Sequence, residues 1–151
     1  MQASLSRRVK GSHNRHKLRL KIASLHAKIS NIRKESLHKL TSHLTDNFAG
    51  IVIEDLNVKG MLSNRKLSRA IADIGFYEFR RQLEYKSKYK GNYLLIAARW
   101  FPSSKLCSNC GQKKEKLKLS ERVYHCFACA YEVDRDFNAA LNLKNLLYQS
   151  G

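Results

Sequence analysis

Four cysteines fall in two closely spaced pairs near the end of the chain. Cys107 and Cys110 enclose two residues, fifteen residues follow, and Cys126 and Cys129 enclose two more. Each C-x-x-C turn brings two thiolates to one side of a tight loop, and Gly111 supplies the backbone freedom that such a loop favours. Four soft sulfur ligands complete a tetrahedral Zn²⁺ shell, which is the ligand set of a structural site. The spacing therefore predicts a zinc ribbon that holds one structural zinc ion.

Two other interpretations of the cysteines are a pair of disulfides and free core thiols. The chain starts without the apolar stretch of a secretory signal peptide, and a basic protein without such a signal is expected in a reducing compartment, where disulfides are rare. With four thiols available, His125 is expected either at the surface or in contact with a ligand without binding the metal itself. The loop between the pairs is itself basic and is a further candidate for nucleic-acid contact, with Lys113, Lys114, Lys116 and Lys118.

Two carboxylates stand where phosphodiester chemistry would use them. Glu54 ends a β-branched run, and Asp136 comes just before the last helical pattern. Acids from separate segments that meet at one sheet edge form the usual cradle for Mg²⁺, where one ion activates water and another stabilises the leaving oxygen. Glu54 and Asp55 should not both face that site, because neighbours in a strand point to opposite faces. Taken alone, each acid also fits a helix cap or a surface charge.

The elements that would position these acids alternate between strand and helix. Residues 49–56 are typical of a strand buried on both faces, residues 67–90 show a helical pattern, and residues 93–98 form a second strand. A strand, a helix and a strand in this order connect by a right-handed crossover, so the class is α/β. Helical spacing returns at 138–147. The middle helix is expected to present its core face through Ile71, Ile74, Phe79 and Leu83.

The amino-terminal segment concentrates the positive charge. Residues 1–40 carry eleven lysines and arginines against one acid, Glu35. Ser12 can cap a long helix that runs to about Asp46, and its apolar residues recur in steps of three and four at Leu18, Ile22, Leu25, Ile29 and Ile32. One interpretation is a solvated helix that packs this stripe on a core. Because acids for ion pairs along the helix are nearly absent, we favour phosphate contacts, made by Arg7, Arg8, Lys10, Arg15, Lys17, Arg19 and Lys21.

The composition of the whole chain supports a polyanionic partner. Among 151 residues, 29 lysines and arginines face 12 acids, which gives a formal net charge of +17. A small domain this basic would repel itself unless it lay beside polyanions, of which phosphate backbones are the commonest. No apolar run approaches the roughly 20 residues that cross a bilayer. We therefore expect a cytoplasmic, nucleic-acid-associated protein with no membrane partner.

Four motifs in this order resemble one protein family. They are Ile53 to Met61, Phe101 to Lys105, Cys107 to Gly111 and Asp134 to Ala140. Together they resemble the carboxyl-terminal half of the TnpB (OrfB) proteins of bacterial insertion sequences, relatives of the type V CRISPR effectors. The resemblance covers nearly the whole chain.

The resemblance implies a RuvC-type, RNase H-like domain with an inserted zinc ribbon. It also implies RNA-guided cleavage of DNA in proteins long labelled transposases, with guide RNA and DNA as partners. Glu54 matches the second RuvC carboxylate of the family and Asp136 the third, and the four cysteines match its zinc ligands.

One part of the family pattern is missing. The first catalytic aspartate of the family lies in a strand upstream of the basic helix, and residues 1–48 hold no such motif. We therefore expect a chain truncated at the amino terminus, with an incomplete RNase H-like domain that binds Mg²⁺ weakly and is inactive alone. The expected division is a basic helical segment at 1–48, a partial RuvC-like domain at 49–101 and 131–148, and a zinc ribbon at 102–130.

Two functional hypotheses from different classes remain. The first is a nucleic-acid-binding zinc-ribbon module without catalysis, a remnant or an accessory of a full-length relative. The second is half of a split nuclease, completed in trans by an upstream fragment that supplies the missing strand. A zinc-ribbon protein of the translation machinery is a third possibility, but such a protein has no reason to carry both acidic motifs.

Overall fold

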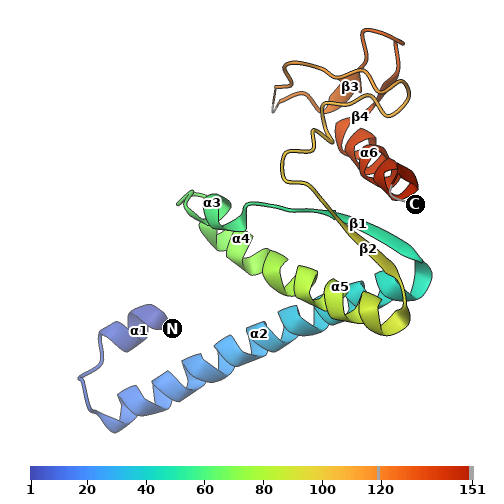
Figure 1. Ribbon diagram of the computed structural model, residues 1–151. Coiled ribbons are helices and arrows are strands. Elements are labelled where there is room, and N and C mark those ends of the chain that lie inside the picture. Colours follow the sequence, from blue (N-terminus) through green and yellow to red (C-terminus); the bar gives the residue numbers. More distant parts are fainter. Residues whose placement is uncertain (119, 150–151) are drawn as a thin grey trace.

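The computed structural model describes residues 1–118 and 120–149 as a mixed α/β protein. Its helices are α1 (Gln2–Ser6), α2 (His13–Asn47), α3 (Val58–Leu62), α4 (Ser68–Ile74), α5 (Phe76–Lys90) and α6 (Arg135–Gln149). Its strands are β1 (Gly50–Glu54), β2 (Tyr93–Ala97), β3 (Val123–His125) and β4 (Glu132–Asp134). In Figure 1 the basic helix α2 lies at one end of the molecule, and α6 with the β3–β4 pair lies at the other.

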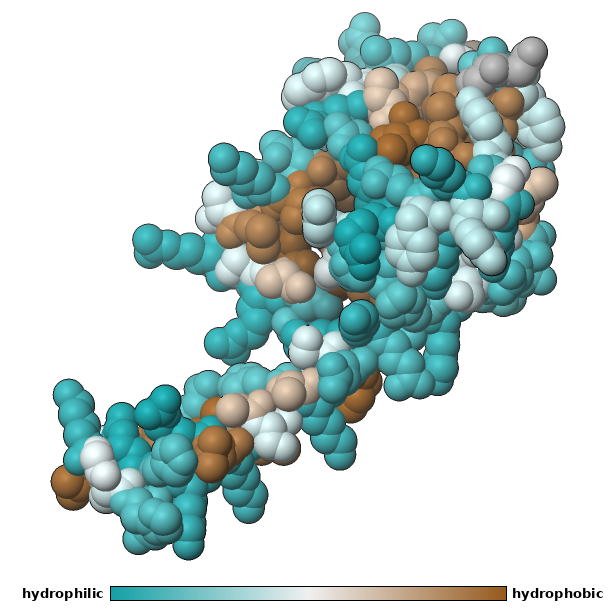
Figure 2. Space-filling view, turned by 60° about the horizontal axis from the view of Figure 1, so that its bottom comes forward, coloured by the Kyte–Doolittle hydropathy of each residue, from teal (hydrophilic) through white to brown (hydrophobic). Residues whose placement is uncertain are grey.

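Helix α2 is the long basic helix that the sequence predicts. Its 35 residues begin after Ser12, whose side chain accepts a hydrogen bond from the backbone N–H of Arg15, as expected of an N-cap serine. The amino-terminal half projects from the rest of the protein (Figure 1), and hydrophilic side chains cover most of this arm in Figure 2. Leu25, Ile29 and Ile32 remain 43–52% exposed. The interpretation that the stripe packs on a core is therefore wrong for these three residues, while Leu18 and Ile22 are half-buried.

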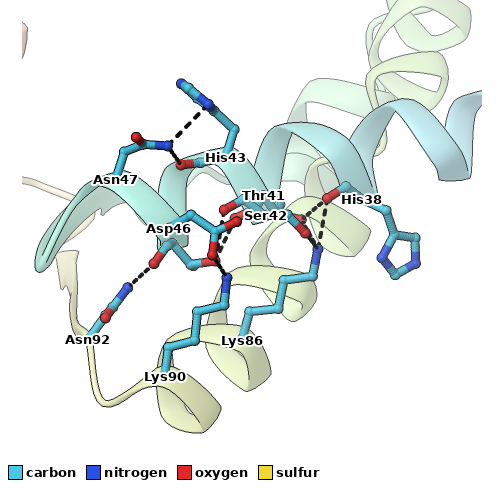
Figure 3. Close-up of polar contacts among 10 residues, drawn as sticks. His38, Thr41, Ser42, His43, Asp46, Asn47, Lys86, Lys90 and Asn92 are labelled. Carbon is cyan, nitrogen blue, oxygen red and sulfur yellow. Dashed lines mark hydrogen bonds and ion pairs between the residues drawn. The ribbon is translucent and has the colours of Figure 1, made fainter.

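The carboxyl-terminal half of α2 packs against α5 through buried polar side chains. Figure 3 shows Lys86 reaching from α5 to three oxygens of α2. Its ammonium donates to the carbonyl of His38 at 2.8 Å, to Thr41 Oγ1 at 2.7 Å and to Ser42 Oγ at 2.8 Å. Burial lowers the pKa of Lys86, because the charged form loses water. Beside it, Asp46 pairs with Lys90, which ties the ends of the two helices together.

The two central strands pair in parallel, as the crossover pattern predicts. Their register runs from Gly50 opposite Tyr93 to Glu54 opposite Ala97. The helix predicted over residues 67–90 is divided instead, because Gly75 adopts a left-handed conformation with φ +72° between α4 and α5. This break turns Ile74 outward, to 52% exposure, so its prediction as a core residue is wrong.

The rest of that helix agrees with the expected core face. Ile71 and Leu83 are buried and Phe79 is half-buried. The short helices α1 and α3 were not predicted. Asn57 begins α3, and its side chain accepts a hydrogen bond from the backbone N–H of Gly60 at 3.0 Å.

Helix α6 covers the central strands and begins earlier than the pattern at 138–147 indicates. It contacts both β1 and β2. The approach to β1 is close, since a Cβ added to Gly50 would lie 3.1 Å from a methyl carbon of Leu147. In the described part of the chain, no helix combines the length and the apolarity that crossing a membrane takes.

Candidate functional site

The four predicted cysteines come together at one point, next to the end of β3. Their sulfur atoms all lie within 4.8 Å of one another. Cys107 lies 3.7 Å from Cys129, and Cys110 lies 3.6 Å from Cys126, measured between sulfurs. Gly111 follows the first pair with φ +76°, and its backbone N–H donates to the carbonyl of Cys107 at 2.8 Å. Four convergent thiols and no carboxylate fit a structural zinc ion.

The groups around the thiols shift the pKa values of two cysteines in opposite directions. The backbone N–H of Tyr131 and the side-chain amide of Asn109 both bond to Cys129 and lower its pKa to about 6. The Gln112 amide acts in the same direction on Cys110, but the crowded neighbouring thiols, Cys129 foremost, outweigh it and raise the pKa of Cys110 to about 12. A divalent cation would relieve this crowding, because it favours the thiolate at every position.

The ribbon has its own small core and an exposed histidine. Tyr124 is 1% exposed between Cys107 and Cys126, and its hydroxyl donates to the carbonyl of Lys105 at 3.1 Å. His125 lies outside the thiol cluster and pairs with Glu132, with 3.2 Å between Nδ1 and Oε2. Beside this core, Lys114 lies over the rings of Tyr124 and Phe127 in a groove of about 700 Å³.

The two predicted catalytic acids lie on elements that touch, and each has its own polar partner. Glu54 ends β1, and its Oε1 accepts a hydrogen bond of 2.6 Å from Ser103 Oγ. Asp136 lies in the first turn of α6, with a side chain 77% exposed and 3.2 Å from Arg135 Nε. Among the described residues, no hydrogen bond or ion pair joins the two carboxylates or brings them to a common partner.

The acids beside them have structural partners. Asp55 lies between two guanidinium groups, 3.0 Å from Arg80 and 2.8 Å from Arg99. Asp134 caps α6, because its Oδ1 accepts hydrogen bonds of 2.9 Å from the backbone N–H groups of Asp136 and Phe137. The sequence could not show the role of Asp55, since its two arginine partners are distant along the chain.

A largely apolar groove of about 650 Å³ opens beside Glu54. Leu37 and Leu40 of α2, Ile53 of β1 and Phe76 of α5 contribute to its walls. No pattern in the sequence had indicated this groove. Apolar walls at the end of a strand that carries an acid indicate a surface that another polypeptide segment can cover.

The predicted phosphate contacts lie at the projecting end of the molecule. Lys10, Lys17, Arg19 and Lys21 are exposed there, as is Arg7. Two of the predicted residues also hold the local fold. Arg15 Nη1 donates to the carbonyls of Leu5 at 2.8 Å and Arg8 at 3.0 Å, and Arg8 donates to the carbonyl of Asn14 at 3.3 Å. These bonds fix α1 against the start of α2.

Three buried polar residues near Glu54 were not predicted from the sequence. Ser103 and Asn142 are each 6% exposed, and Asn138 is fully buried. Two asparagines four residues apart, on the face of α6 that should be apolar, were the available signal. Nothing in the sequence indicated that Ser103 would reach β1.

Two family models match the chain. One, described as a Cas12f1-like TNB domain, matches residues 76–143. The other, OrfB of IS605, described as "Probable transposase", matches residues 1–65. Together they cover both the projecting basic segment and the cysteine cluster.

Curated proteins match over nearly the whole chain. Two are named "Putative RNA-guided DNA endonuclease", from Streptomyces pristinaespiralis (47% identity, 94% of this chain and 35% of that protein) and Escherichia coli K12 (InsQ; 37% identity, 95% and 39%). TnpB-like protein L79 of Acanthamoeba polyphaga mimivirus is 31% identical over 87% of the chain and 26% of its own length. The chain thus spans little more than a third of the length of the most similar of these.

Solved structures share the fold. A Cas12f1–sgRNA–target DNA complex matches with a TM-score of 0.66 and 23% identity over 87% of this chain and 38% of that one. A CRISPR-Cas12f ternary complex matches with a TM-score of 0.67 and 23% identity, over 91% and 28%. At this level of identity the likeness concerns the fold.

Proposed function

The chain belongs to the TnpB (OrfB) family as the carboxyl-terminal region of its members, and we propose that it is the nucleic-acid-binding, zinc-ribbon part of a RuvC-type nuclease. One observation carries this proposal: α6, which begins next to Asp136, docks on β1, which ends at Glu54. This contact supports the proposal, because a nuclease of this type uses carboxylates from separate elements that meet at one sheet edge.

The proposal divides the chain into three parts. Residues 1–48 form a basic helical segment, residues 49–101 and 131–148 a partial RNase H-like domain, and residues 102–130 a zinc ribbon. The exposed cations of the first part are proposed to contact the phosphates of guide RNA and DNA. Two observations support this. The segment carries many cations and almost no acids. A protein of similar fold has also been solved in a complex with sgRNA and target DNA.

The described residues do not by themselves fit a two-ion Mg²⁺ site. Glu54 bonds to Ser103, Asp136 is 77% exposed and pairs with Arg135, and Asp55 is held by two arginines. A site that binds two divalent ions needs a carboxylate that bridges them. We therefore propose that these 151 residues alone do not cleave DNA, and that they act by binding nucleic acid.

A second candidate function rests on the apolar groove beside Glu54. A polypeptide segment from a longer relative or a separate fragment, added along β1, would cover Leu37, Ile53 and Phe76 and could carry a third acid to Glu54. In this alternative the chain is half of a split nuclease.

A cleavage assay separates the two functions. The zinc-loaded chain is incubated with Mg²⁺, a guide RNA and labelled DNA, alone and with the part of the Streptomyces pristinaespiralis protein that precedes the matched region. We expect no cleavage by the chain alone. Cleavage only in the mixture, lost in Glu54→Ala and Asp136→Ala and kept in the Asp73→Ala control, would establish the split nuclease. Cleavage by the chain alone, lost in the same two variants, would contradict the proposal.

A further inference from the structure

A buried serine holds the carboxylate that ends β1. Ser103 is 6% exposed, and its Oγ lies 2.6 Å from Glu54 Oε1. A bond from a neutral hydroxyl to a carboxylate at this distance is charge-assisted and short. This bond is made by Oε1 of Glu54 and does not involve Oε2. Since Glu54 is otherwise exposed at the strand end, Ser103 restricts the rotamers of this side chain.

Ser103 is held in turn by α6. The Asn142 side-chain amide donates to the carbonyl of Ser103 and to the carbonyl of Leu106, both at 2.8 Å. One amide group therefore fixes the two ends of the short segment 103–106, which leads into the first cysteine pair. The backbone N–H of Ser103 also donates to the carbonyl of Phe101 at 2.9 Å.

The same contacts continue into the first cysteine pair. Asn138, one helical turn before Asn142, donates to the carbonyl of Leu106 at 2.6 Å. Its Oδ1 accepts a hydrogen bond of 2.9 Å from the backbone N–H of Ser108, which follows Cys107 directly. Asn138 and Asn142 thus share the carbonyl of Leu106 as an acceptor. Through this shared acceptor, the backbone beside Cys107 is linked by hydrogen bonds to Ser103, whose hydroxyl bonds to Glu54.

Burial makes this series specific. Asn138 is 0% and Asn142 6% exposed, and a buried amide that loses its hydrogen-bond partners destabilises the fold. Each asparagine therefore favours the loop conformation in which its bonds are made. In that conformation the Ser103 hydroxyl bonds to Glu54. The same conformation requires a folded first cysteine pair, because only then does the backbone N–H of Ser108 donate to Asn138.

We infer that Ser103 is a positioning residue for Glu54, and that Asn142 and Asn138 couple the orientation of the Glu54 carboxylate to the zinc-bound state of the ribbon. This inference rests on the proposed function in one respect, because the orientation of Glu54 matters only if its carboxylate binds a metal ion. A zinc ion in the ribbon would then support the site at a distance, through hydrogen bonds and without entering the chemistry.

The test follows the side-chain carboxyl carbon of Glu54 by NMR in the full chain, zinc-loaded and labelled with ¹³C-glutamate. The Glu54→Gln variant assigns the resonance by removing it. We expect Ser103→Ala to shift this resonance by more than its line width and Ser103→Thr, which keeps the hydroxyl, to restore it. Asn142→Ala should shift the Glu54 resonance as well. The double variant with Ser103→Ala should show a shift little larger than that of either single variant. Ser108→Ala is the matched control, because only the backbone N–H of that residue takes part.

Removal of zinc by a chelator supplies the second arm. The Glu54 resonance should move in the wild-type chain and should not move further in Ser103→Ala. A resonance that stays in place in both Ser103→Ala and the zinc-free wild type would overturn the inference, and so would an equal shift from Ser108→Ala.

Paramagnetic broadening by Mn²⁺ separates the inference from the proposed function. We expect Mn²⁺ to broaden the Glu54 resonance in the wild type and to do so less in Ser103→Ala. If Mn²⁺ never broadens Glu54, the proposed metal role of Glu54 fails, while the response to zinc and to Ser103→Ala still tests the coupling. Equal broadening in both proteins, with an unmoved resonance, would contradict the coupling alone.

Discussion

Lys86 Nζ lies 2.7 Å from Thr41 Oγ1, and this bond joins α5 to α2 across a buried interface. The two other oxygens around the ammonium, from His38 and Ser42, are also uncharged. The hydrogen bonds of Lys86 are therefore all made to neutral dipoles, while burial works against its charge and the nearby Lys90 adds repulsion. Asp46 offsets this in part.

The lowered pKa of Lys86 predicts a stability that rises with pH. Below the ordinary value of 10.5 the folded protein holds the proton less tightly than the unfolded chain, so unfolding takes up protons. The contribution is full above 10.5 and is lost as pH falls through the folded pKa. Urea unfolding of wild type and Lys86→Met should thus give a free-energy difference that changes in favour of the wild type between pH 8 and about 10.5. A flat difference would contradict the assignment.

Replacement of one thiol should remove the metal and unfold the ribbon. We expect one zinc per wild-type chain by elemental analysis and substantially less in Cys126→Ser, because the ribbon has only a small core around Tyr124. The melting transition of Cys126→Ser should fall to that of the chelated wild type. His125→Ala is the control. The imidazole of His125 faces Glu132, so the zinc content of this variant should be unchanged. Full zinc in Cys126→Ser would exclude the four-thiol site.

Salt dependence should reveal whether the projecting end of α2 binds phosphates. Joint replacement of Lys17, Arg19 and Lys21 by alanine should reduce the slope of log K against log salt by up to about 3 for duplex DNA, at ~0.9 for each phosphate contact. Fluorescence anisotropy between 50 and 200 mM salt measures this. The matched set is Lys59, Lys66 and Arg69, with the same charges on α3, α4 and the loop between them. Equal losses from the two sets would indicate a diffuse charge without a special role for α2.

The two neighbouring acids at the start of α6 should differ in their effect on stability. Asp134→Ala removes a cap with two hydrogen bonds and should lower the free energy of unfolding by about 1 kcal/mol. Asp136→Ala should change it by less than about 0.5 kcal/mol, because its carboxylate is 77% exposed. Chemical denaturation of both variants measures the two values. A larger loss in Asp136→Ala would mean that Asp136, and not Asp134, stabilises the start of α6.

The break between α4 and α5 should depend on glycine. Gly75→Ala places a Cβ in a left-handed conformation and 3.2 Å from Leu37 Cδ1, so we expect a loss of about 1–2 kcal/mol in thermal or urea unfolding. Gly75→Asn should cost less, because asparagine tolerates φ > 0 better. If Gly75→Ala instead stabilised the protein, α4 and α5 would be one continuous helix in solution.

Local signals predicted much of this fold. Ser12 and the spacing from Leu18 to Ile32 predicted α2, and two short apolar runs predicted the parallel pair β1 and β2. The division at Gly75 was missed because a single glycine is tolerated inside many helices, so the sequence does not show which glycine adopts a left-handed φ. The exposed apolar stripe of α2 was missed because periodicity predicts a face but not whether anything covers it.

The site was predictable only in part, for a related reason. The cysteine spacing predicted the cluster that the structure contains, because the two cysteines of each pair are close in sequence. The acids were identified by their places at element ends, but Asp55 and Asp134 could not be separated from Glu54 and Asp136 without their partners. Ser103, Asn138 and Asn142 depend on contacts more than thirty residues apart, which no local pattern encodes.

The ribbon interrupts the chain between β2 and α6, and this has a consequence for the order of folding. Helix α6 can reach β1 only after the segment from Ala97 to Arg135 has closed as a loop. A metal bound by four thiols acts on that loop as a cross-link and more than halves the free chain that must be ordered. Each halving lowers the entropic cost of closure by about 0.6 kcal/mol. Zinc availability should therefore set the rate at which α6 joins the sheet during refolding.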